Sequence, residues 1–363
     1  MKICILGAGA MGGALTVPFS DRGHTVALWC TEYDEEVHWA LTAGRPHPEL
    51  NVSLPDAIRI YPAEYIEEAL SGAELVVLGV ATSGVLPVIR QAAPHLRAKT
   101  SILTVAKGFV SNNGIADPVP SGVQRELQKL NDIARPEVVG LAGPSIAGEL
   151  VRRRPTAAAV AAKSHQKALD LCRELATSYF WLDPIKDARG LEICLAYKNI
   201  YSIALAWPEG LSGNEDRSST LNLSAILLLQ TINELRRLIA SRRGDPDTSS
   251  GWPGLGDLVA TAGGGRNGRF GSLLAEGNSP DKAAEIMEDE GVGTVEGLKT
   301  ASTGEDYAVQ TLGRDWATQL PLLHAIRNVL EGRESVRDVV GRIDRFNARE
   351  TNSQTEPNPV TTQ

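Results

Sequence analysis

The chain has 363 residues, 42% hydrophobic and 22% charged, which is ordinary for a soluble globular protein and long enough for two domains. A formal net charge of −8 argues against non-specific nucleic-acid binding. No uninterrupted run of about 18 apolar residues occurs, so we expect no membrane span. The four cysteines lie far apart without paired spacing, which indicates reduced core thiols of a cytoplasmic protein and no metal site.

The first 30 residues show a strand, a glycine turn, a helix and a second strand. An apolar run at 2–6 leads into the glycine turn, a helical pattern reaches about Arg22, and residues 25–30 form the next strand. This is the context that a dinucleotide fingerprint requires, because the glycines let a pyrophosphate approach the N-terminus of the helix. The expected cofactor contacts are Gly7, Gly9, Ala10, Met11 and Gly12.

Further apolar strands alternate with helical segments up to residue 187. This alternation predicts an α/β domain over 1–187, with a Rossmann-type, doubly wound, mostly parallel sheet. Ligands bind beyond the carboxyl ends of such strands, where Lys107 and Gly143-Pro144-Ser145 fall. By position alone Lys107 could equally be a solvated turn residue. The predicted strands lie at 74–80, 101–105, 138–142, 156–162 and 179–182.

The end of the second strand bears on the choice between NAD and NADP. An acidic residue there binds the ribose hydroxyls and disfavours a 2′-phosphate. The strand ends at Thr31, which we expect to contact the cofactor, and Glu32 and Asp34 follow. After Thr31 no lysine or arginine follows until Arg45, so the sequence favours NAD over NADP.

From Gly190 onward the strand pattern stops and helical periodicity takes over. We predict an all-α domain over 188–346, interrupted by a polar insertion at 212–220. The final stretch, 347–363, is polar with two prolines and is predicted to be a disordered tail. The predicted helical segments are 191–207, 220–241, 254–262, 268–276, 281–289 and 319–331.

Lys198 and Asn199 interrupt a segment that is otherwise apolar on every helical face between Leu191 and Trp207. A helix that is apolar all round is a buried helix. A buried ammonium acquires a lowered pKa or a dedicated partner, and such lysines perform acid–base chemistry. The alternative is a lysine whose stem is buried while its head reaches the surface.

A second group of polar residues lies near a glycine-rich loop. Asp257 opens a helix, either as its N-cap or as a carboxylate partner for Lys198. The loop starting at Gly263 leads to Arg266 and Asn267, and its N–H groups together with the arginine fork suit a phosphate. A basic surface loop would have a similar sequence. The six histidines lie away from these motifs, which favours lysine as the proton carrier.

These motifs occur in the order found in NAD(P)-dependent sn-glycerol-3-phosphate dehydrogenases. Over about residues 1–340 the chain resembles that family, with an opening similar to an archaeal branch. The ordered motifs are Gly7-Ala-Gly-Ala-Met-Gly12, Ala106-Lys107-Gly108, Gly143-Pro-Ser-Ile-Ala-Gly-Glu149, Pro155-Thr156, Tyr197-Lys198-Asn199, Gly254-Leu-Gly-Asp257-Leu, Arg266-Asn267-Gly-Arg-Phe-Gly271 and Val295-Glu296-Gly297.

The resemblance implies reversible, NAD(P)H-dependent reduction of dihydroxyacetone phosphate to sn-glycerol 3-phosphate, a reaction of glycerophosphate metabolism and phospholipid biosynthesis. It makes Lys198 the general acid/base and Lys107 the group that polarises the carbonyl. The remaining implied roles are Asp257 and Thr261 at the hydroxyl end, Arg266 and Asn267 at the phosphate with Asn199 nearby, Gly143 and Ser145 at the substrate, and Lys107, Ala147, Arg266 and Glu296 at the cofactor.

Two departures from the family keep a second substrate open. Gln230 stands where the family usually carries an arginine, and segment 208–223 is unlike its usual counterpart. Both favour a paralogue acting on another small phospho- or phosphonoalcohol.

Two further alternatives share the architecture. A ketopantoate-reductase-like or 3-hydroxyacid dehydrogenase would not need the Arg266-Asn267 loop. A silent cofactor sensor would be expected to lose Lys198 or Lys107. Helical domains of this kind often self-associate, so a homodimer is an open expectation, although the sequence indicates no dimer surface.

Overall fold

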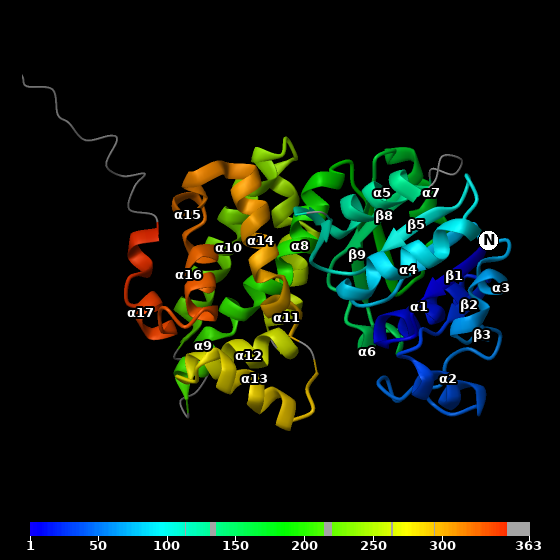
Figure 1. Cartoon of the computed structure of the whole chain (residues 1–363), viewed down its shortest axis with the longest axis horizontal. Helices are drawn as coiled ribbons and strands as arrows, with labels where there is room; N and C mark the ends of the chain where they lie inside the picture. Colours follow the sequence, from blue (N-terminus) through cyan, green and yellow to red (C-terminus); the bar gives the residue numbers. More distant parts are fainter. Residues whose placement is uncertain (113, 131–135, 214–219, 263, 294, 347–363) are drawn as a thin grey trace, which may run out of the picture.

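The computed structural model describes residues 1–346 apart from 113, 131–135, 214–219, 263 and 294. A sheet-based N-terminal domain lies beside a helical C-terminal domain (Figure 1). The predicted tail at 347–363, most of the polar insertion at 212–220 and Gly263 fall outside the described residues. Of the helices that the structure describes, none is long and apolar enough to cross a bilayer.

The N-terminal sheet has eight strands in the order β10-β9-β8-β5-β4-β1-β2-β3. Neighbouring strands are parallel except β8 and β9, which confirms the predicted mostly parallel, Rossmann-type sheet. The strand order reverses between β1 and β4, where such sheets bind dinucleotides. The strands are β1 (Lys2–Leu6), β2 (Thr25–Trp29), β3 (Arg59–Tyr61), β4 (Leu75–Leu78), β5 (Ser101–Thr104), β8 (Glu137–Ala142), β9 (Thr156–Ala162) and β10 (Phe180–Pro184).

Three short strands were not predicted. β3 is a three-residue strand at the sheet edge, while β6 (Phe109–Asn112) and β7 (Ile115–Pro118) pair with each other in a separate hairpin. Strands this short contain too few alternations for a pattern to be recognised.

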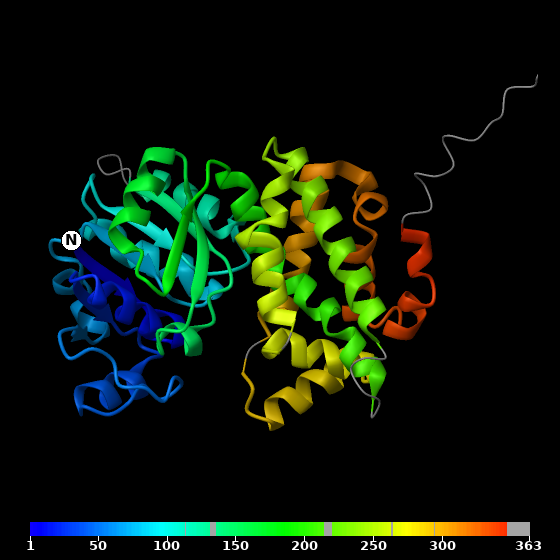
Figure 2. The same cartoon turned by 180° about the vertical axis from the view of Figure 1, so that it is seen from behind.

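Helices pack on both faces of the sheet (Figures 1 and 2). Ile3 and Ile5 of β1 enter the core on one face, and Cys4 and Leu6 enter the core on the other. Burial on both faces explains why the central strands read as continuous apolar runs. All four cysteines are buried and unpaired. The helices are α1 (Ala10–Asp21), α2 (Glu35–Thr42), α3 (Ile66–Leu70), α4 (Val85–Ala92), α5 (Val119–Leu130), α6 (Ala147–Leu150) and α7 (His165–Leu175).

The C-terminal domain is organised around α8 (Ala188–Leu205). Every residue of this helix from Ile193 to Leu205 is buried, as its uniformly apolar sequence predicts. Neighbouring helices surround it on several sides (Figure 2). The other helices are α9 (Trp207–Ser212), α10 (Leu221–Ser241), α11 (Asp257–Ala262), α12 (Arg266–Ala275), α13 (Pro280–Asp289), α14 (Glu296–Leu312), α15 (Trp316–Gln319), α16 (Pro321–Leu330) and α17 (Val336–Val340).

The sequence pattern does not predict the long helix α14. It contains two glycines, which lower helix propensity and obscure the periodic pattern. Both are needed for close packing on α8: a Cβ at Gly297 would lie 2.3 Å from the Asn199 carbonyl oxygen, and one at Gly304 would lie 2.6 Å from Ile200. The residues that hide α14 in the sequence are therefore those that dock it against the central helix.

Glu192 joins the two domains near the start of α8. It accepts a hydrogen bond from the Ser121 hydroxyl on α5. Burial raises the pKa of the Glu192 carboxyl to about 7, and the Ser121 bond opposes that rise. In the unfolded chain the same carboxyl has a pKa of about 4.3. Between these two values it therefore holds its proton in the folded protein and has lost it in the unfolded chain.

Replacing Glu192 with glutamine tests this linkage. The folded state binds more protons than the unfolded state between about pH 4.3 and the raised pKa, so wild-type stability falls as pH rises through that window. Glutamine does not ionise, so the variant should not lose stability in this window. We expect the free energy of unfolding of Glu192→Gln, relative to wild type, to be greater at about pH 8 than at about pH 4.5 by roughly 2 kcal/mol. Urea unfolding at both pH values measures the difference. A stability change that is the same at both values would contradict the raised pKa.

Candidate active site

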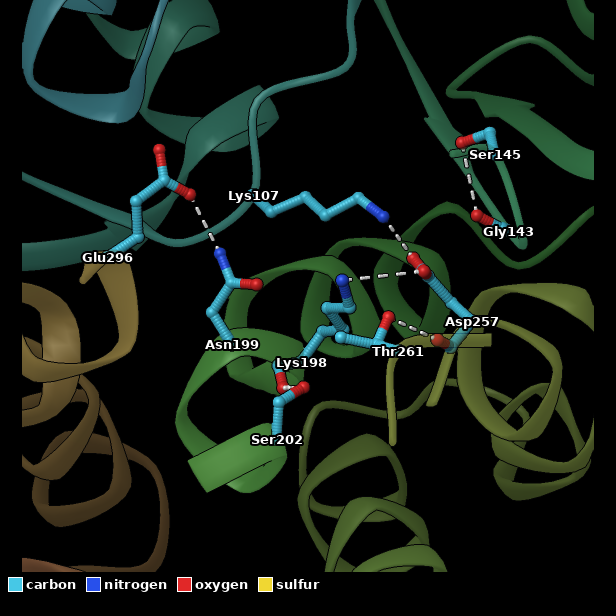
Figure 3. Close-up of polar contacts among 9 residues, drawn as sticks. All are labelled: Lys107, Gly143, Ser145, Lys198, Asn199, Ser202, Asp257, Thr261 and Glu296. Carbon is cyan, nitrogen blue, oxygen red and sulfur yellow. Dashed lines mark hydrogen bonds and ion pairs between the residues drawn. The ribbon is translucent and has the colours of Figure 1, made fainter. Parts of the chain in front are cut away.

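Lys198 lies in the middle of α8 with its ammonium inside the protein. The residue is 9% exposed, and its Nζ lies 3.6 Å from Asp257 Oδ1 (Figure 3). Burial, with a further contribution from Lys107, lowers the pKa of Lys198 to about 8, while Asp257 and Glu296 act in the opposite direction. The ammonium points at a dedicated carboxylate, so the alternative of a head group at the surface is wrong.

Lys107 reaches the same carboxylate from the other domain. It follows β5, and its Nζ donates a hydrogen bond to Asp257 Oδ2 (Figure 3). Asp257 is 2% exposed and therefore bridges two ammonium groups in a largely buried site. A single buried carboxylate compensates part of two positive charges and leaves the cluster net positive, which suits an oxygen that gains negative charge.

Of the two roles open for Asp257, N-cap or carboxylate partner, the structure shows the second. A π-helical turn, Trp252–Gly256, runs directly into α11, so the backbone is already helical when it reaches Asp257. Its carboxylate is directed at the two lysines. Thr261, one turn later, donates its hydroxyl to the Asp257 carbonyl oxygen at 2.7 Å and lines the same pocket.

Asn199, Glu296 and Asn267 connect three helices around the lysines. Asn199 Nδ2 on α8 donates to Glu296 Oε2 at 2.8 Å, at the first residue of α14 (Figure 3). Asn267 Oδ1 on α12 accepts the Gly297 N–H at 2.8 Å and so caps the start of α14. This bond uses the oxygen of the Asn267 side chain. The two N–H donors of its amide nitrogen therefore remain available to a ligand.

Arg266 begins α12 directly after Gly265, whose φ of +85° favours glycine. Arg266 is exposed, and no carboxylate among the described residues forms an ion pair with it. It lines a pocket of about 570 Å³ between the domains. The predicted residues that this pocket brings together are Met11, Lys107, Ser145, Lys198, Asn199, Asp257, Thr261, Arg266, Asn267 and Glu296.

The other predicted residues lie around this pocket without lining it. Gly143 accepts the Ser145 hydroxyl at 3.1 Å, and a Cβ at Gly143 would lie 2.6 Å from the Ala157 carbonyl oxygen. Gly143 therefore allows β8 to approach β9 closely and orients Ser145. Ala147 begins α6 directly after the pocket residue Ile146.

The glycine turn at α1 has the form that a dinucleotide pyrophosphate requires. Gly7 has a φ of +104°, and a Cβ at Gly12 would lie 2.0 Å from the Gly7 carbonyl oxygen, so neither position tolerates a side chain. A Cβ at Gly9 would meet nothing within 4 Å, which leaves the helix N-terminus open to a ligand. No acidic residue occupies the first turn of α1. The turn and its helix dipole fit a bound pyrophosphate.

Thr31, which is expected to contact the cofactor, is hydrogen-bonded to Asp34 in the structure. Its backbone N–H and its hydroxyl both donate to Asp34 Oδ2 at 2.8 Å, and the Ala8 N–H donates to the same oxygen at 3.1 Å. Thr31 and the glycine turn thus hold the Asp34 carboxylate beside the end of β2. The expected contact of Thr31 with the cofactor stays a prediction, and the Asp34 carboxylate lies within hydrogen-bond distance of both Thr31 and the glycine turn.

His47 is a functional candidate that the sequence analysis missed. It is fully buried, and its Nε2 donates to the Ala8 carbonyl oxygen at 2.8 Å behind the glycine turn. The expectation that no histidine lies beside a motif is therefore wrong in space, although it is true along the chain. A histidine between two prolines was the only signal, and nothing in the sequence connects it to Ala8.

Gln230 does not line the pocket. It is buried on α10 and donates its amide to Glu234 Oε1 at 2.9 Å. Glu234 also accepts the backbone N–H groups of Leu322 and Leu323 and the Tyr201 hydroxyl, so it caps the start of α16. Gln230 therefore belongs to the group that supports α16 and lies outside the catalytic pocket, so its link to a changed substrate loses its basis.

The fold and the site together define a nicotinamide-dependent oxidoreductase with a helical catalytic domain. Comparison with known proteins agrees. Residues 2–168 match the model for the N-terminus of NAD-dependent glycerol-3-phosphate dehydrogenase, and residues 187–341 match the model for its C-terminus. The chain belongs to the NAD-dependent glycerol-3-phosphate dehydrogenase family.

Individual relatives support the same family. The chain is 41% identical over 301 residues to an NADP(+)-dependent glycerol-3-phosphate dehydrogenase of Archaeoglobus fulgidus, covering 83% of this chain and 88% of the relative. It is 30% identical to a glycerol-3-phosphate dehydrogenase [NAD(P)+] of Desulfotalea psychrophila, covering 94% and 97%. The crystal structure of glycerol-3-phosphate dehydrogenase from Coxiella burnetii superposes with a TM-score of 0.78 at 27% identity, covering 94% and 98%. Use of NAD or NADP follows from this membership.

Proposed function

We propose that this enzyme reversibly reduces dihydroxyacetone phosphate to sn-glycerol 3-phosphate, with Lys198 as the general acid/base. The observation that carries the proposal is the buried Lys198–Asp257–Lys107 cluster in the same pocket as Arg266. A buried lysine with a lowered pKa and an exposed arginine that no described carboxylate pairs with thereby line one cavity.

The charges in the pocket orient the substrate. The phosphate would bind the Arg266 guanidinium and the free amide donors of Asn267, because both lie at the N-terminus of α12. The carbonyl would then lie over the two ammonium groups, with the hydroxyl end toward Ser145 and Thr261. Glu149, also at that end, would repel a phosphate and so disfavours the reverse orientation.

In the reduction, a bound nicotinamide cofactor would supply the hydride that the carbonyl carbon gains. Lys198 gives its proton to the carbonyl oxygen, and Lys107 stabilises the negative charge that develops there. Asp257 keeps both ammonium groups aimed at this oxygen and raises the pKa of Lys198 against the effect of burial. In the oxidation, neutral Lys198 accepts the proton of the alcohol.

The glycine turn would hold the cofactor pyrophosphate on the N–H groups of Ala10, Met11 and Gly12. For the adenosine ribose we infer a preference for NAD(H), because the Asp34 carboxylate held by Thr31 would repel a 2′-phosphate. The archaeal relative is named NADP(+)-dependent, which makes the preference a direct question for experiment. We also propose a cytoplasmic location, because the four cysteines are buried and unpaired, as is usual under reducing conditions.

The experiment that tests the function is NADH and NADPH oxidation by the purified protein with dihydroxyacetone phosphate. We expect turnover within the usual range of about 1–1000 per second. We also expect a higher kcat/KM with NADH than with NADPH. Cofactor binding without turnover would contradict the substrate assignment, and a preference for NADPH would contradict the role given to Asp34.

The pH dependence should have opposite signs in the two directions. Reduction needs protonated Lys198, so kcat/KM for dihydroxyacetone phosphate should fall as pH rises through about 8, whereas oxidation needs neutral Lys198 and should accelerate over that range. Lys107 lowers the pKa of Lys198 and Asp257 raises it. Lys107→Met should therefore move the inflection to higher pH and Asp257→Asn to lower pH. Profiles with unmoved inflections in both variants would remove Lys198 as their source.

The second candidate is a paralogous reaction on another small phospho- or phosphonoalcohol. Its remaining support is segment 208–223, since Gln230 lies in the core. Pro208, Glu209, Thr220 and Leu221 of this segment line a separate hollow that also contacts Ala262 at the end of α11. Other phosphorylated ketones and aldehydes should be assayed if dihydroxyacetone phosphate is not reduced.

A further inference from the structure

A large hollow lies next to the catalytic pocket and shares Ala260 of α11 with it. This apolar recess has a volume of about 1260 Å³ and separates the turn Trp252–Gly256 and α11 from the β9–β10 edge of the sheet. Its apolar walls come from Pro144, Ile185, Trp252, Leu255 and Val259.

A smaller hollow of about 290 Å³ borders both the recess and the catalytic pocket. It shares Ile146, Glu149 and Ala260 with the catalytic pocket. It shares Pro144, Trp252 and Ala260 with the apolar recess. The three hollows therefore all border Ala260 on α11.

Large apolar side chains are unusually exposed at this place. Ile146, Trp181, Trp252 and Val259 line the two outer hollows or their rim, and each is at least 41% exposed. Exposed apolar side chains that cluster in a concave surface mark a binding site for an apolar group.

The charged residues of the recess do not favour a second phosphate. Asp245 caps the following turn by accepting the Asp247 N–H, and Asp247 forms an ion pair with Arg236. Asp187 accepts the Thr248 hydroxyl. Lys186 is the one cation among the residues that line the recess. Carboxylates around apolar walls would admit a neutral chain and repel an anion.

The proposed substrate orientation points into this recess. With the phosphate on Arg266 and Asn267, the hydroxyl end lies beside Ser145 and Thr261, next to Ala260 and Ile146 where the catalytic pocket meets the smaller hollow. We propose that the enzyme also reduces dihydroxyacetone phosphates that carry an apolar substituent on the C1 oxygen, as an ether or an ester. This inference rests on the proposed function, whose substrate class it extends.

The chemistry needs no additional reactant. The ketone carbon at C2 gains a hydride from the reduced nicotinamide, which becomes oxidised, and the ketone oxygen gains the Lys198 proton. The C1–oxygen bond that carries the substituent is neither formed nor broken. The product is a 1-O-substituted glycerol 3-phosphate.

The test is a series of 1-O-alkyl dihydroxyacetone phosphates from methyl to hexyl, assayed beside dihydroxyacetone phosphate. We expect kcat/KM to rise by about fourfold for each methylene that becomes buried. A shift of tryptophan emission to shorter wavelength on adding the hexyl compound, measured with oxidised cofactor to prevent turnover, should report binding near the exposed Trp252 and Trp181. A kcat/KM that stays flat or falls along the series would overturn the proposal, even with dihydroxyacetone phosphate fully active.

Val259→Arg places a charge in the recess at an exposed position, so the variant should fold. It should abolish the dependence on chain length and leave dihydroxyacetone phosphate kinetics unchanged. Val309→Arg, at a similarly exposed position on α14 outside the recess, is the matched control and should keep the dependence.

Two results would contradict this role of the recess. One is a Val259→Arg variant that retains the wild-type dependence on chain length. The other is a dimeric wild type that becomes monomeric in Val259→Arg while kcat/KM of the wild type is the same for every chain length, since a second copy of the chain would then cover the recess. Failure of dihydroxyacetone phosphate itself would instead reject the proposed function.

Discussion

Alanine in place of Lys198 is expected to lower kcat for dihydroxyacetone phosphate reduction by about 10³-fold, because positioned proton transfer contributes about 10²–10⁴ to a rate. Lys198 is the proton donor in the proposed mechanism, and its ammonium lies 3.6 Å from Asp257. Steady-state kinetics in both directions would measure the loss. Binding of NADH, followed by its fluorescence, should stay near the wild-type value, since the glycine turn lies on α1 in the other domain.

Lys198→Met and Lys198→Arg separate chemistry from packing. Methionine fills most of the buried volume without a proton, so it should be as inactive as alanine while unfolding at nearly the wild-type temperature. Arginine keeps the charge but does not release its proton at ordinary pH, so it should also be slow. Loss of cofactor affinity equal to the loss of rate would show that Lys198 supports the fold of the cleft instead of the proton transfer.

The second large effect is expected at Arg266. Its replacement by alanine should raise KM for dihydroxyacetone phosphate by about 10–100-fold, because a hydrogen bond to a charged group contributes about 1.5–3 kcal/mol. Arg266 has no carboxylate partner among the described residues, so no ion pair is broken by the change. The kcat at saturating substrate should change much less than KM.

Unphosphorylated dihydroxyacetone provides the control for Arg266. Its weak turnover should be nearly the same in wild type and Arg266→Ala, since it has no phosphate to lose contact with. Arg266→Lys should recover part of the affinity, because a lysine keeps the charge without the bidentate fork. Equal damage with both substrates would remove Arg266 from the phosphate site.

Local patterns in the chain determined the fold class and most of the pocket. The glycine turn, the buried strands and the uniformly apolar α8 predicted the Rossmann-type sheet, the helical domain and a buried Lys198. These predictions hold because each depends on neighbours along the chain: a turn needs its own glycines, and a buried helix needs apolar residues on every face. The motif order pointed to the family.

The tertiary structure decided which residues meet. Lys107 and Asp257 are 150 residues apart and share a hydrogen bond, His47 reaches the glycine turn, and Gln230 belongs to the core. The glycines of α14 also read as helix breakers until their contact with α8 is known. No local propensity encodes such contacts, because they depend on how separate elements pack. The sequence thus specified the chemistry available, and packing selected the groups that act together.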